Sequence, residues 1–151
     1  MLTELLAALE AAGAVEALRQ SRWTYPVVNT GHILGLALLF GAIVPLDLRM
    51  VGLWRAVDPA SLERVLVPVA AVGLGLALPT GFMLFAVRAS EYAAMPLFQA
   101  KVAIVTLAVL NAGLALTRRR AGRRVTPAAA IVSMGLWGGA ITAGRFVAYV
   151  D

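Results

Sequence analysis

Cysteine is absent from this chain of 151 residues, and histidine occurs only once. A chain without cysteine forms no disulfide, no thiolate metal site and no iron–sulfur cluster, and it offers no cysteine nucleophile. The sequence also lacks a glycine-rich phosphate loop, an H-E-x-x-H motif and a serine beside the histidine. These absences favour a protein that is not an enzyme.

Charged residues are also scarce, since Asp, Glu, Lys and Arg make up only 14% of the chain. The hydrophobic fraction is 61% and the mean hydropathy is +0.86, which is more apolar surface than a water-soluble fold of this size can bury. Uncharged runs cover residues 23–46, 65–87, 102–117 and 125–144. Each run, with its margins, can cross a hydrocarbon core of about 30 Å as a helix.

We therefore expect an all-α fold, a transmembrane four-helix bundle that forms a single membrane domain over residues 1–151. The expected spans are about 24–47, 62–87, 97–117 and 127–149. The pairs Asp58–Pro59 and Thr126–Pro127 resemble an N-cap followed by a first-turn proline, so both predict helix starts.

Residues 1–20 lack the pattern of a secretory signal, so we treat them as part of the mature protein. Leu2, Leu5, Leu6 and Leu9 form one apolar stripe, which predicts a short amphipathic helix on the outer membrane surface. A disordered tail is the alternative for this segment.

Orientation follows from the positive charge of one short loop. Its five arginines are Arg118, Arg119, Arg120, Arg123 and Arg124. The positive-inside rule places this loop in the cytoplasm, where it can meet anionic lipid, and leaves both termini outside. The formal net charge of +5 does not indicate nucleic-acid binding, because no basic face with interleaved aromatic residues is present.

Small residues form two ordered rows within the first two spans. Gly31 and Gly35 make a G-x-x-x-G step, and Gly73, Ala77 and Gly81 repeat the spacing on the second span. Such rows let helix backbones approach closely. They predict packing within the chain or, alternatively, a homodimer face.

A polar site near the outer leaflet is the main functional prediction. His32 lies about two turns inside the first span with Tyr25 and Asn29 on its side, and Lys101 and Arg145 lie at a similar depth. An ionisable residue at such depth costs about 2.5 kcal/mol or more and is a functional candidate. These residues could hold an anionic or carbonyl-bearing ligand. The alternatives are a neutral histidine bonded to a neighbouring helix, and cations that pair with Glu91 or extend to the interface.

Two further constellations are weaker. Asp47 and Arg49 lie at the inner end of the first span, where we expect Asp47 to end the helix and pair with a nearby arginine; a proton relay is the alternative. One histidine is too few for a bis-histidine haem, although Met83 could supply a sulfur opposite His32. Asn111 is expected to form an interhelical hydrogen bond.

The stretch WTYPVVNTGHILGLALLFG at 23–41, followed by DLRMVG at 47–52, resembles a bacterial family of small multi-spanning membrane proteins of unknown function. A weaker element is FQAK at 98–101. A distant likeness to CopD-type copper-resistance proteins and b-type cytochrome bundles comes from a histidine on an early span and a lysine opening a later one. The resemblance implies a four-helix membrane bundle in a bacterial inner membrane, with His32, Asp47 and Arg49 as positions of interest.

Taken together, the sequence predicts an accessory or small-ligand-binding subunit of a bacterial inner membrane, with membrane lipid as a partner and a homo-oligomer or larger complex as a possible assembly. The first alternative is a redox protein that carries one haem b. The second is a small transporter component, for which the third and fourth spans offer no buried acidic residue to accompany the basic ones.

Overall fold

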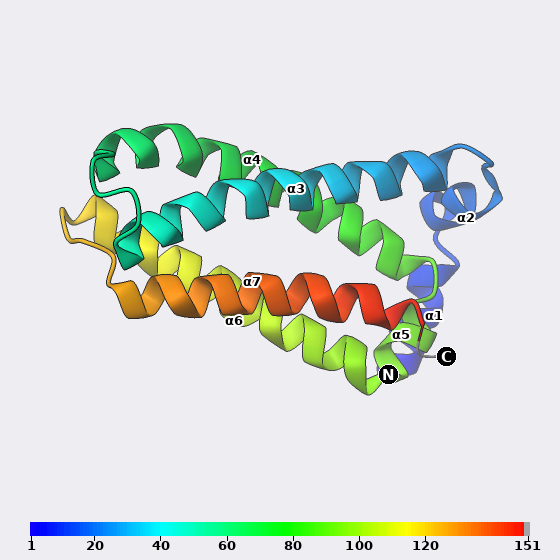
Figure 1. The fold of residues 1–151 in the computed structure, drawn as a ribbon. Coiled ribbons are helices and arrows are strands. Elements are labelled where there is room, and N and C mark those ends of the chain that lie inside the picture. Colours follow the sequence, from blue (N-terminus) through cyan, green and yellow to red (C-terminus); the bar gives the residue numbers. More distant parts are fainter. Residues whose placement is uncertain (150–151) are drawn as a thin grey trace.

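The fold was obtained as a computed structural model, which describes residues 1–149 except for the side chain of Leu2. Throughout this range the regular structure is helical (Figure 1). The helices are α1 (Leu2–Glu10), α2 (Gly13–Gln20), α3 (Thr24–Val51), α4 (Pro59–Ala86), α5 (Ala89–Ala94), α6 (Pro96–Arg120) and α7 (Pro127–Val147).

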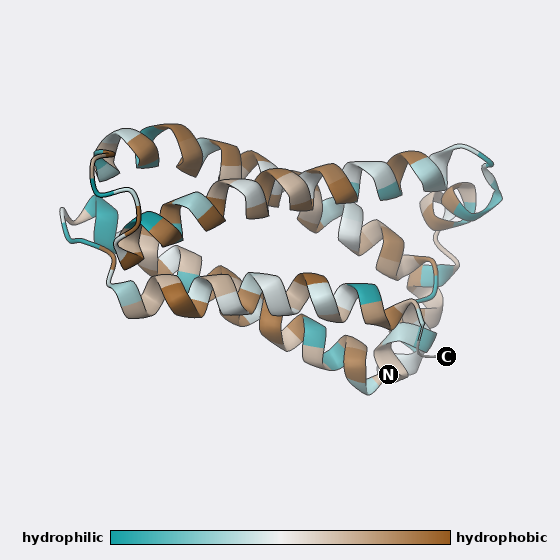
Figure 2. Cartoon of the chain, viewed as in Figure 1, coloured by the Kyte–Doolittle hydropathy of each residue, from teal (hydrophilic) through white to brown (hydrophobic). Residues whose placement is uncertain are grey.

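Four of these helices, α3, α4, α6 and α7, are long and apolar enough to cross a membrane. Hydrophobic residues run along all four, while hydrophilic residues gather at the two ends of the bundle (Figure 2). The expected all-α, four-span architecture is confirmed, and the chain is a multi-pass membrane protein. The loop 52–58 and the loop 121–126 lie at one end, and α1, α2 and α5 lie at the other.

Local capping fixes where two of the spans begin. The Asp58 carboxylate accepts a hydrogen bond from the backbone N–H of Ser61 at 2.8 Å, and the Thr126 hydroxyl accepts one from Ala129 at 3.3 Å. Each cap precedes a proline at the first helical position, where the missing N–H costs nothing. Both predicted helix starts are therefore confirmed.

The N-terminal segment forms two helices, where the sequence predicted one. The turn at Ala11 and Ala12 separates α1 from α2. The Glu10 carboxylate accepts a hydrogen bond from the backbone N–H of Ser90 at 2.6 Å, and the Arg19 guanidinium donates one to the Val87 carbonyl at 2.7 Å. These long-range bonds hold the segment against the turn between α4 and α5.

Helices α3 and α4 form the tightest pair in the bundle. A side chain added at Gly35 would meet the backbone of Ala77 and of Gly73, and one added at Gly73 would meet the backbone of Leu39. The two rows of small residues therefore pack against each other, and the prediction of packing within the chain is confirmed.

The remaining packing joins α6 to α7, and α7 to α3, so the spans are linked in the order α4, α3, α7, α6. Leu39, Ile43, Ala108 and Trp137 form the buried core between α3, α6 and α7. Helices α4 and α6, at the two ends of this series, do not pack together to a comparable extent. The bundle is therefore left with one open side.

Candidate functional site

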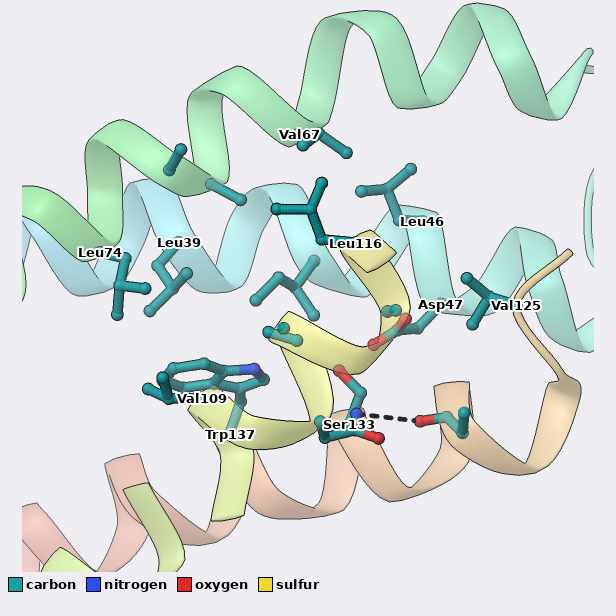
Figure 3. A pocket seen from close by; sticks show the side chains of 18 of the residues that line it. Leu39, Leu46, Asp47, Val67, Leu74, Val109, Leu116, Val125, Ser133 and Trp137 are labelled. Atoms are coloured by element: carbon teal, nitrogen blue, oxygen red, sulfur yellow. Dashed lines mark hydrogen bonds between the residues drawn. The ribbon is translucent and has the colours of Figure 1, made fainter. Parts of the chain in front are cut away.

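A groove of about 280 Å³ lies on the open side, between α4 and α6, and its floor is formed by α3 and α7 (Figure 3). Most of its lining is aliphatic. The apolar side chains include Leu39, Ile43, Leu46, Val67, Leu74, Val109, Leu116 and Val125. A groove of this kind, within a membrane span, suits the hydrocarbon part of a ligand.

One carboxylate interrupts the apolar lining. Asp47 is only 6% exposed, and its Oδ2 atom has no hydrogen-bond partner within residues 1–149. The side chain of Ser133, 8% exposed on α7, lies beside it (Figure 3). Helix α3 continues one turn beyond Asp47, to Val51, so Asp47 lies within the helix on the same face as the core residues Leu39 and Ile43.

The predicted pairing of Asp47 with Arg49 is wrong, and so is the prediction that Asp47 ends the helix. The Arg49 Nε donates a hydrogen bond to the Val57 carbonyl at 2.7 Å, and its terminal nitrogen donates one to the Arg55 carbonyl at 3.3 Å. Two residues apart on a helix, the side chains point about 160° away from each other. Arg49 therefore braces the 52–58 loop, while Asp47 faces the groove.

Arg119 closes the end of the groove nearest the loops. Its Nε lies 3.1 Å from the Glu63 carboxylate, so the two side chains form an ion pair between α6 and α4. This contact does not have the geometry of a hydrogen bond, because Arg119 Nε has no hydrogen-bond partner within residues 1–149. The two side chains are 17% and 26% exposed, so they are partly shielded from solvent. Arg119 also lines a second, polar cleft with Asp58, Arg123 and Arg124, so this ion pair separates the groove from that cleft.

Two more polar side chains line the same groove. Trp137 is 3% exposed, and its indole Nε1 has no hydrogen-bond partner in the described part of the chain. The Asn111 amide donates a hydrogen bond from α6 to the Ala129 carbonyl of α7 at 3.3 Å. The predicted interhelical role of Asn111 is thereby confirmed, and its amide oxygen stays available as an acceptor.

At the other end of the bundle, His32 packs against α4. Its Nδ1 donates a hydrogen bond to the Ala77 carbonyl at 2.9 Å and lies 3.3 Å from the Thr80 hydroxyl. Gly81 makes room for the ring, since an added Cβ there would lie 2.8 Å from the imidazole. The alternative of a histidine bonded to a neighbouring helix is confirmed.

The other residues of the predicted outer site face different surroundings. Tyr25 and Asn29 are exposed, and the Arg145 guanidinium donates a hydrogen bond to the Tyr149 hydroxyl at 2.6 Å. The Lys101 amine lies 5.6 Å from the centre of the Phe98 ring. No hydrogen bond or ion pair connects these residues with His32 among residues 1–149, although Lys101 lies close enough for its charge to act on the imidazole, and the outer site stays a prediction.

The haem alternative depends on His32 and Met83. Met83 is 38% exposed on α4, and neither residue lines the groove. Within the described residues no three His, Asp or Glu side chains are grouped as metal ligands. The groove therefore gives no geometric support to haem binding by His32 and Met83.

Sequence reasoning missed the groove because it assigned Asp47 to a helix end. Asp47 lies four residues after Ile43 and eight after Leu39, on the face that forms the core, and this helical spacing was the available signal. The third and fourth spans contain no acidic residue, as the sequence shows, but Asp47 of the first span lines the same groove as Arg119.

The groove thus combines an apolar wall with polar atoms that have no hydrogen-bond partner within residues 1–149. In comparisons with protein-family models, curated proteins and solved structures, the chain has no match.

Proposed function

We propose that this multi-pass membrane protein binds a small amphiphilic molecule in the groove between α4 and α6. The ligand enters sideways from the bilayer, where the two helices do not pack together. Its apolar part lies along Leu39 and Leu74, and its polar head lies at Asp47 and Ser133. This keeps the predicted small-ligand-binding role and moves the site from the outer end of the bundle to the end that holds the arginine-rich loop.

The observation that carries the proposal is the Oδ2 atom of Asp47, which is buried at one end of an apolar groove and has no hydrogen-bond partner within residues 1–149. A buried polar group without a partner costs about 1–3 kcal/mol, and more when it is charged. A lipid acyl chain can fill the groove but cannot satisfy this oxygen. A ligand with both an apolar tail and a hydrogen-bonding head does both.

The proposed setting is a bacterial inner membrane with the 118–124 loop in the cytoplasm and both termini outside. The five arginines there, from Arg118 to Arg124, support this orientation and a contact with anionic lipid. In that orientation the ligand head lies near the cytoplasmic leaflet. The protein then acts as a binding or accessory subunit.

Trp137 provides an internal reporter for this proposal. It is 3% exposed, whereas Trp23 and Trp54 are 73% and 53% exposed, so a Trp23→Phe/Trp54→Phe chain carries one tryptophan in the groove. In lipid nanodiscs, tail-brominated dodecanol should quench this fluorescence saturably, because a tail in the groove brings bromine to the indole.

Two alanines of α6 supply a matched comparison. Ala112→Phe places a ring in the groove and should abolish the saturable quenching, while Ala103→Phe, an exposed position outside the groove lining, should leave it unchanged. Quenching that rises linearly with probe, without saturation and equally in both variants, would mean that the groove holds no ligand.

A further inference from the structure

The polar end of the groove is rich in hydrogen-bond acceptors. Asp47 contributes a carboxylate, and Ser133 contributes a hydroxyl oxygen beside it (Figure 3). Asn111 contributes its amide oxygen, because its amide nitrogen is already bonded to the Ala129 carbonyl. Three acceptor groups from three helices, α3, α7 and α6, therefore line the groove, with Asn111 bonded to Ala129 one helical turn before Ser133.

The charge at this end is negative. Arg119 is the one cation that lines the groove within the described residues, and it pairs with Glu63 at 3.1 Å. Arg123 and Arg124 line the separate polar cleft. Arg119 is shared, because it pairs with Glu63 and its charge also acts on Asp47, and Asp47 forms no ion pair of its own within the described residues.

We propose that the ligand of the groove is an amphiphile whose head is a primary ammonium group. An ammonium has three N–H donors, which match the three acceptor groups, and its single positive charge matches Asp47. This inference deepens the proposed function and rests on it. A neutral alcohol would leave the charge unmatched, and a carboxylate would be repelled by it.

The indole of Trp137 adds a second recognition element. Its Nε1 is donor-only and unpaired within residues 1–149, and Figure 3 places the ring next to Ser133 on the groove floor. An oxygen on the ligand, close to the ammonium group, would accept this hydrogen bond. A long-chain amino alcohol therefore fits the site more fully than a simple alkylamine.

A series of probes with one tail and different heads tests the inference on the single-tryptophan protein in nanodiscs. Dodecylamine, dodecanol, dodecyltrimethylammonium and dodecanoate, each brominated in the tail, are titrated against Trp137 fluorescence. We expect dodecylamine to bind at least tenfold more tightly than the other three. The quaternary head serves as the control for charge alone, because it lacks N–H donors.

Asp47→Asn keeps the shape of the side chain and removes its charge. In this variant the preference for dodecylamine over dodecanol should disappear, while binding of dodecanol stays as in the parent. Glu91→Gln makes the same chemical change on an exposed carboxylate of α5 and should leave the preference intact.

The possible results separate the two levels of the proposal. Equal binding of all four heads, or an unchanged preference in Asp47→Asn, would overturn the ammonium head and leave the ligand groove standing. An absence of saturable quenching by any probe would overturn the groove as well. The probe series on the parent protein decides the question even if the variant does not fold.

Discussion

At the scale of single residues, two glycines decide how closely the first two spans approach. Gly35 and Gly73 face each other, and a Cβ added at either one would run into the backbone of the opposite helix. Backbone cannot move aside as a flexible side chain can, so a substitution here must separate α3 from α4. Gly75, two residues along α4, has nothing within 4 Å of an added Cβ.

We therefore predict opposite outcomes for Gly73→Ala and Gly75→Ala. The first should destabilise the protein by about 1–3 kcal/mol through overpacking, and the second should be neutral or stabilising by up to about 1 kcal/mol through helix propensity. Unfolding by SDS in mild detergent micelles, followed by far-UV circular dichroism, measures both. Equal stabilities for the two variants would contradict the close approach of α3 and α4.

The residue scale is also where sequence reasoning reached its limit. Helical spacing placed His32 and Asn111 inside the bundle, but it could not say which neighbour each would bond, because that depends on how α4 and α7 are rotated. Asp47 and Arg49 are both charged and lie at a span end, so local sequence suggested a pair. Helical spacing puts Asp47 on the same face of α3 as Leu39 and Ile43, and the packing of α7 against α3 turns this face inward.

At the scale of the element, the start of α4 depends on one exposed cap. The Asp58 carboxylate accepts hydrogen bonds from the hydroxyl and the backbone N–H of Ser61, which lower the pKa of Asp58 below its usual value. A lowered pKa in the folded state means that the cap stabilises the helix at neutral pH. That contribution is lost as the pH falls through the lowered pKa.

Hydrogen exchange at the Ser61 amide should reveal this dependence. We predict that the ratio of its exchange rate in the wild type to that in Asp58→Asn stays constant near neutral pH, and rises as acidification protonates the wild-type carboxylate. Asparagine caps without titrating, so the ratio cancels the intrinsic effect of pH on exchange. A ratio that stays flat down to the acid end would argue against a cap by the ionised carboxylate.

Element boundaries were more predictable than side-chain partners, for a physical reason. The cap-and-proline pairs at Asp58 and Thr126 are local, so the sequence alone contains the whole signal for those two helix starts. The break between α1 and α2 and the short helix α5 depend on contacts between segments about 80 residues apart, such as the bond from Ser90 to Glu10. No local pattern encodes those contacts.

At the scale of the whole molecule, both loops that join spans within a hairpin lie at one end, and α1, α2 and α5 lie at the other (Figure 1). We predict that the first end faces the cytoplasm, because it carries the arginine-rich loop. The chain has no cysteine, so single-cysteine variants need no background substitutions.

Gly122→Cys and Ser90→Cys report on the two ends. In intact cells an impermeant maleimide should label Ser90→Cys and leave Gly122→Cys unlabelled, and permeabilisation should expose the second position. Both residues lie outside the four spans, so access to the reagent depends only on sidedness. The reverse pattern of labelling would invert the proposed topology.

The helices pack in the linear order α4, α3, α7, α6, so the bundle consists of two hairpins that meet at the interface between α3 and α7. In the α3/α4 hairpin the two helices are in backbone contact at Gly35 and Gly73. In the other hairpin α6 packs against α7. At the loop end, the ion pair of Arg119 and Glu63 bridges α6 and α4, the outer helices of the two hairpins. Under the proposed function, a ligand that passes between α4 and α6 at the loop end would have to separate this ion pair, while the contacts within each hairpin could stay in place.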